Sequence, residues 1–131
     1  MAAYLSAAWL DDLNRTAGAD DGLRSATAGA RVVIQQVVTG AAGSDDVRYW
    51  VQVDDGSVLV GAGDAPQPTA TVTQSYGTAV AVSRGDLAVE DAILGGKARL
   101  EGDIGALVRH QAALQSVATV LAGVRDRTTY A

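Results

Sequence analysis

The sequence has no cysteine and no phenylalanine, and only two prolines in 131 residues. Without cysteine there can be no disulfide framework, thiolate metal site or cysteine nucleophile. The single histidine, His110, cannot build a His-rich metal site, and no Gly-x-Ser-x-Gly motif presents a serine nucleophile to it. We therefore predict no metal and no cofactor, and expect His110 to have a role on a helix face or at the surface rather than in catalysis.

Long apolar runs and an excess of positive charge are also missing. No apolar run reaches the roughly 18 residues that a membrane-spanning helix needs, and the N-terminus lacks the charged start of a signal peptide. The formal net charge of −5 argues against non-specific nucleic-acid binding and against a polybasic membrane patch. These absences predict a cytoplasmic protein with no nucleic-acid partner and no transmembrane segment.

Glycines are frequent, but none of them completes a phosphate-binding loop. Gly61-Ala-Gly63 lacks the third glycine of a dinucleotide-binding motif, and Gly96-Lys97 is followed by alanine instead of serine or threonine. The spacing therefore indicates no nucleotide site.

Hydrophobic residues make up 48% of the chain, and aliphatic side chains and alanine supply nearly all of them. A chain of this length can bury a core of its own, and we expect one domain over residues 1–131. A core made mainly of Val, Ile, Leu and Ala needs either close interdigitation or tolerance of a cavity.

Alternating, β-branched segments predict five strands. Asp55-Gly56 predicts a tight hairpin turn, and both prolines fall in a loop over residues 63–68. A further turn is expected over residues 40–46. The predicted strands cover residues 31–39, 47–54, 57–62, 69–73 and 97–102, and the first three are expected to be antiparallel.

Helical periodicity and capping residues predict four helices. We expect Ser75, Asp86 and Asp103 to cap the last three, and Gly85 and Gly95 to end the two short ones. A polar loop with a helical turn near residues 23–27 should separate the first helix from the first strand. The predicted helices cover residues 3–13, 76–83, 87–94 and 104–124.

One stretch of the sequence resembles a known family. Residues 68–73 and 85–103, with Gly85-Asp-Leu87, Ala92-Ile93, Gly96-Lys97 and Leu100-Glu-Gly-Asp103, resemble the sterol carrier protein 2 (SCP-2) family. The resemblance extends to the N-terminal helix with Trp9, and the closing residues resemble small stand-alone bacterial members. It implies an α/β fold of the α+β type, a five-stranded mixed sheet covered on one face by helices.

The same resemblance implies an apolar tunnel between sheet and helices that takes a sterol, a fatty acid or an acyl-CoA. Ile93 stands where the family often has phenylalanine, which changes the expected shape of that space. The alternative is an ordinary core, because tunnel walls and cores use the same residues. The candidate wall residues are Val80, Ile93, Leu94, Leu107, Leu114 and Leu121, with Tyr76 and Gln52 as polar members.

Two other functions fit the sequence. A tunnel that holds a reactive conformer could cyclise a polyketide or terpenoid, with Gln35, Gln52, Tyr76 and His110 as its polar groups. Alternatively, an apolar groove could receive a partner helix or an acyl carrier protein. The absence of a catalytic constellation favours binding and transfer of a hydrophobic small molecule.

Overall fold

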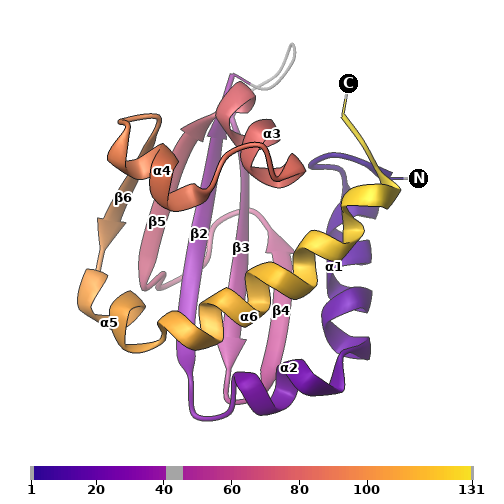
Figure 1. Cartoon of the computed structure of the whole chain (residues 1–131), viewed down its shortest axis with the longest axis vertical. Helices are drawn as coiled ribbons and strands as arrows, with labels where there is room; N and C mark the ends of the chain where they lie inside the picture. Colours follow the sequence, from indigo (N-terminus) through magenta and orange to yellow (C-terminus); the bar gives the residue numbers. More distant parts are fainter. Residues whose placement is uncertain (1, 41–45, 131) are drawn as a thin grey trace.

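A computed structural model describes residues 2–40 and 46–130, and its centre is a mixed five-stranded sheet (Figure 1). The strands are β2 (Arg31–Thr39), β3 (Val47–Asp54), β4 (Ser57–Ala62), β5 (Ala70–Ser75) and β6 (Ala98–Gly102). Their order is β4-β3-β2-β5-β6; β2 and β5 run parallel, and the other neighbours are antiparallel. The fold class is confirmed, and all five predicted strands form, although β5 covers Ala70–Ser75 instead of 69–73 and β6 begins at Ala98 instead of 97.

The hairpin between β3 and β4 also forms as predicted. Asp55 and Gly56 both have positive φ, 46° and 92°, as a type I′ turn requires. The carboxylate of Asp55 accepts the N–H of Gly29 at 2.7 Å, which ties the turn to the end of the N-terminal helical segment. Most of the turn expected over residues 40–46 lies outside the described residues.

Helices cover one face of this sheet, and α3, α4 and α6 lie in front of it in Figure 1. No helix in the described part of the chain is long and apolar enough to cross a bilayer. The helical elements are α1 (Ala7–Ala19), α2 (Asp21–Ala26), α3 (Tyr76–Arg84), α4 (Val89–Leu94), α5 (Ile104–Arg109), α6 (Gln111–Leu121) and the 3-10 helix η1 (Ala122–Arg127).

The prediction of a first helix over residues 3–13 is wrong at both ends. Leu5 has φ 68°, which breaks the helical path, and the Ser6 hydroxyl caps α1 by accepting the Trp9 N–H at 3.2 Å. Ala2–Ala3 instead form strand β1, which pairs in parallel with β7 (Thr128–Thr129). The helix then continues to Ala19, and α2 follows almost directly.

Two further helix predictions need correction. Asp86 does not cap α4, because that helix starts after Ala88, and the Asp86 carboxylate lies 3.7 Å from the Arg84 guanidinium instead. Asp103 caps α5 as predicted, accepting the Ala106 N–H at 3.0 Å. The single helix expected over residues 104–124 is interrupted at His110, whose φ of −107° and ψ of 21° end α5.

Candidate functional site

The two faces of the sheet carry different side chains. Successive residues of a strand alternate between faces, so Val32, Ile34 and Val38 of β2 point toward the helices, while Val33 and Gln35 point away. The face under the helices is mostly apolar, so space for an apolar ligand would lie between these two layers.

One apolar cluster lies between β2, β3 and the helices α2 and α6. Its buried members include Val32, Val53, Leu23 and Val117. Large side chains at its margin stay only partly buried, among them Leu107, Leu114 and Leu121.

A second cluster lies on the other half of the sheet, between β5, β6 and α4. Its buried members are Val72, Ala92 and Ala98. Val82 of α3, Ile93 of α4 and other large side chains pack against it and are again only partly buried.

Ile34 packs against both clusters, although each has its own buried centre. It sits on the central strand under the helices and still keeps some solvent exposure. We use the name interior seam for five half-buried aliphatic side chains that pack at the margins of these two clusters: Ile34, Val82, Ile93, Leu107 and Leu114. All five side chains keep some solvent exposure, so the sheet and its helices do not bury them completely.

Four of the residues predicted from the sequence lie at or beside the interior seam: Ile93, Leu107, Leu114 and Leu121. Leu121 also packs against a third cluster, around Trp9. Val80 and Tyr76 belong to α3, and both are partly buried.

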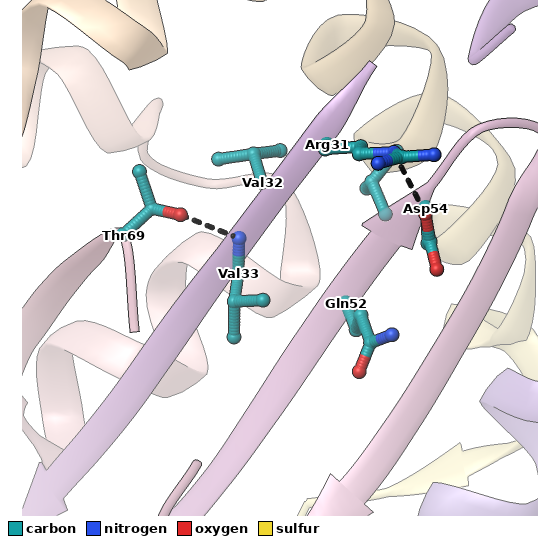
Figure 2. Close-up of a pocket in the computed structure, with 7 residues that line it drawn as sticks. Arg31, Val32, Val33, Gln52, Asp54 and Thr69 are labelled. Atoms are coloured by element: carbon teal, nitrogen blue, oxygen red, sulfur yellow. Dashed lines mark hydrogen bonds and ion pairs between the residues drawn. The ribbon is translucent and has the colours of Figure 1, made fainter. Parts of the chain in front are cut away.

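Leu94 and Gln52 are not brought to this seam. Leu94 is 85% exposed at the end of α4, because Ala92 and Ile93 take the inward positions of that short helix. Gln52 lies on the face of the sheet away from the helices, beside Val33, because its neighbours Val51 and Val53 point inward (Figure 2).

Sequence reasoning missed a polar pair at one end of this interior. Gln36 of β2 and Gln74 of β5 share the inner face, and the Gln74 Nε2 donates to the Gln36 Oε1 at 3.3 Å. Gln74 is 7% exposed, and its Oε1 has no hydrogen-bond partner among the described residues. A polar residue at an inward position of each strand was the available signal.

A group of aromatic rings lies beside this pair, at the same end of the sheet. Tyr49 is opposite Gln36 on β3 and meets Trp9 edge-on at a centroid distance of 5.4 Å. Tyr4 lies 4.9 Å from Trp9, 6.1 Å from Tyr76 and 5.1 Å from Tyr130. The Tyr4 hydroxyl donates to the Ala79 carbonyl of α3 at 3.3 Å.

Burial is the main reason that the pKa of Tyr4 and of Tyr49 lies well above the ordinary value of 10.0. A phenol is already neutral at physiological pH, and the raised pKa keeps these two neutral further into the alkaline range. This end of the interior therefore offers uncharged hydrogen-bonding groups.

The polar residues of the cyclising alternative are not gathered at one place. Gln35 lies on the outer face, where its amide binds the carbonyls of Tyr49 and Gly63 and the N–H of Ala65. Gln52 shares that face, Tyr76 begins α3, and His110 joins α5 to α6. Among the residues that the structure describes, no group of three or more acidic or histidine side chains could hold a metal ion.

Two depressions lie outside the interior. One of about 420 Å³ opens at the end of β2 and β3, where Arg31 pairs with Asp54 at 3.3 Å beside Gln52 and Thr69 (Figure 2). The other, of about 270 Å³, lies between α2 and α6. Both are open to solvent, so neither is an enclosed site for a hydrophobic molecule.

The fold and its interior together define a small mixed α/β protein. Helices cover one face of its sheet, and an apolar layer lies between the sheet and these helices. The sequence profile of the SCP-2 sterol transfer family matches residues 10–115. The chain belongs to this family, as its motifs predicted. No curated protein matches the sequence significantly.

Solved structures show the same fold. A crystal structure of sterol carrier protein 2 superposes with a TM-score of 0.74 at 21% identity, covering 91% of this chain and 97% of its own. A conserved hypothetical protein from Thermus thermophilus gives 0.73 at 20% identity, with 92% and 88% coverage. Sterol carrier protein domain 2 of Helicoverpa armigera gives 0.64 at 18% identity, with 88% and 87% coverage.

Proposed function

We propose that this protein binds a hydrophobic small molecule along the interior seam and carries it through the cytoplasm. The observation that carries the proposal is Ile34, which lies between two apolar clusters on the central strand and is incompletely buried. Membership of the SCP-2 sterol transfer family supports the same function.

Binding of a hydrophobic ligand needs no catalytic group, because burial of its apolar surface supplies the binding free energy. Each methylene group that leaves water contributes about 0.8 kcal/mol, so a long acyl chain or a ring system between the layers would bind usefully. The ligand would replace solvent against side chains such as Ile34, Leu107 and Leu114, which remain partly accessible without it.

A bulky substitution inside the seam tests the proposal. We expect Leu114→Trp to occupy part of the proposed ligand space at the interior seam and to weaken binding of a pyrene-labelled hydrocarbon at least tenfold, measured by fluorescence titration. The matched control is Leu59→Trp on β4, whose side chain is 49% exposed and lies on the outer face. Circular dichroism should show that both variants are folded.

The proposal fails if the unmodified protein binds no apolar probe. It fails equally if Leu114→Trp and Leu59→Trp, both folded, bind the pyrene-labelled hydrocarbon as tightly as the unmodified protein.

A further inference from the structure

The two edges of the sheet are treated differently. At the β4 edge, Asn14 of α1 covers the strand: its amide donates to the Val60 carbonyl at 2.8 Å and accepts the Val60 N–H at 2.7 Å. At the other edge, β6 is the last strand, and no strand in the described part of the chain pairs with its outer side. An edge of this kind can pair with a further strand.

The backbone of Leu100, at the middle of β6, is oriented for such pairing. The Asp103 N–H donates to the Thr69 carbonyl at 2.9 Å, and Leu100 lies opposite Val72 in the same ladder. Hydrogen-bonded and non-hydrogen-bonded pairs alternate along antiparallel strands, so the N–H and C=O of Leu100 point away from β5.

The charges on either side of Leu100 are self-complementary. Arg99 and Glu101 lie on the outer face of the sheet, 3.8 Å apart, with side chains 77% and 67% exposed. If a second copy pairs antiparallel with Leu100 opposite Leu100, Arg99 of each copy lies opposite Glu101 of the other. The same register sets Lys97 opposite Asp103, just outside the strand.

The charges also select that register. A shift of the pairing by two residues in one direction sets Glu101 opposite Glu101, and a shift in the other direction sets Arg99 opposite Arg99. Like charges directly opposite each other destabilise a strand pair. The sequence of β6 therefore fits one antiparallel alignment with itself and disfavours its neighbours.

Exposed apolar side chains lie at both ends of this edge. Four large hydrophobic residues are exposed in the described part of the chain, and only Leu59 of β4 is distant from β6. Leu94 of α4 is 85% exposed, and Ile104 and Val108 of α5 are 45% and 66% exposed. Figure 1 shows α4 at one end of β6 and α5 at the other. In an antiparallel pair, the α4 end of one copy meets the α5 end of the other.

We propose that the β6 edge is a homodimer interface, in which two copies pair through β6 about Leu100 and join their sheets into one. Leu94 of each copy then packs against α5 of the other, and Arg99 binds Glu101 across the two-fold axis. Burial of the apolar side chains supplies affinity, while the charges select the partner and the register. This interface does not depend on a ligand in the interior seam.

Charge reversal tests the register. We expect light scattering of the unmodified protein to show a mass that rises from one chain to two between low micromolar and submillimolar concentration. Arg99→Glu sets two carboxylates opposite each other at both pairs, and Glu101→Arg sets two guanidinium groups there. Each variant alone should dimerise at least about tenfold more weakly. An equimolar mixture of the two variants should recover the dimer, because opposite charges then face each other at both pairs.

The matched control for charge is Arg31→Glu. Arg31 forms a similar exposed pair with Asp54, at 3.3 Å, but lies on β2, away from the β6 edge. This variant should dimerise like the unmodified protein. For the apolar contact, Leu94→Asp should weaken the dimer and Leu59→Asp should not. Circular dichroism checks that each variant is folded.

A mass of one chain at every concentration of the unmodified protein overturns this inference. So does a dimer that both folded charge variants retain, or a mixture of the two that does not recover association. Loss of phospholipid-vesicle binding in Leu94→Asp, with the same mass in every variant, would assign the apolar ends of the edge to a membrane and overturn it as well. The proposed function stands in each case, because these measurements involve no ligand of the interior seam.

Discussion

At the scale of single residues, one buried carboxylate joins the two ends of the chain. Asp12 of α1 is 8% exposed, and the Arg127 guanidinium binds both of its oxygens at 3.1 Å. That hydrogen bonding also raises the pKa of Arg127. Removal of the arginine would leave a buried carboxylate with only a distant, exposed cation, Arg15, at 3.8 Å.

We therefore expect Arg127→Ala to lower the thermal unfolding midpoint clearly and Arg15→Ala to change it little, since exposed pairs contribute little. Differential scanning calorimetry at neutral pH measures both. Equal midpoints for the two variants would contradict the assigned role of Arg127.

The buried phenols predict how stability changes with alkaline pH. The pKa of Tyr4 and of Tyr49 is raised above 10.0 in the folded protein, mainly by burial. The stability present in full below pH 10 is therefore lost as the pH rises past 10 toward the raised values, because the unfolded chain releases these protons first.

Phenylalanine at both positions should weaken this dependence. We expect the unfolding free energy from urea titration to fall between about pH 9 and about pH 11 in the unmodified protein, and less steeply in Tyr4→Phe/Tyr49→Phe. The comparison uses slopes, since Tyr4→Phe also loses the bond to Ala79 at every pH. An equally steep fall in the double variant would be inconsistent with phenols that stay neutral.

At the scale of elements, the caps of the short helices differ in what they contribute. Asp103 accepts the Ala106 N–H at the start of α5, whereas Asp86 precedes α4 without capping it. We expect Asp103→Ala to lower the unfolding free energy by about 1 kcal/mol. Asp86→Ala, the matched control, loses only an exposed ion pair at 3.7 Å and should change it by less than about 0.5 kcal/mol.

Urea unfolding of the two variants measures the difference. If Asp86→Ala cost as much as Asp103→Ala, the assignment of the cap to Asp103 alone would be wrong.

The strands were more predictable than the helices, and the reason is physical. The alternation over Arg31–Thr39 and the Asp55-Gly56 turn are local signals in the sequence. The folded protein has a strand and a tight turn at these positions, as the signals predict. The first helix depends on a distant contact: Ala2–Ala3 pair with Thr128–Thr129, and this pairing prevents residues 3–6 from continuing the helix. His110 likewise interrupts an unbroken apolar periodicity, which no local residue type predicts.

At the scale of the whole molecule, the C-terminal segment closes the aromatic end of the interior. Tyr130 lies against Tyr4, and its hydroxyl is 2.7 Å from that of Ser83 in α3. Removal of residues 128–131 should therefore expose Trp9, which is 4% exposed in the intact protein.

In a Trp50→Phe background, so that Trp9 alone emits, we expect the truncation to shift the emission to longer wavelength and to lower the thermal midpoint by several degrees. A spectrum and a midpoint that both stay unchanged would show that the segment contributes nothing to closing this end.

The candidate site was predictable only in part. Amphipathic periodicity identified Leu107, Leu114 and Leu121, because an inward helix face is visible in a single sequence. It could not separate the seam from the core, since exposure of Ile34 depends on how two clusters meet across the sheet. Gln36 and Gln74 are far apart in the chain, and only the pairing of β2 with β5 makes them neighbours.

The parallel pairing of Ala2 with Thr128 has a practical consequence. A short glycine-rich linker could join the two ends into a covalent ring without reorganising the fold, and new ends could then be opened in the exposed loop at residues 63–68. Any carrier or label fused to either end of the present chain would project from the same corner of the molecule, beside α3.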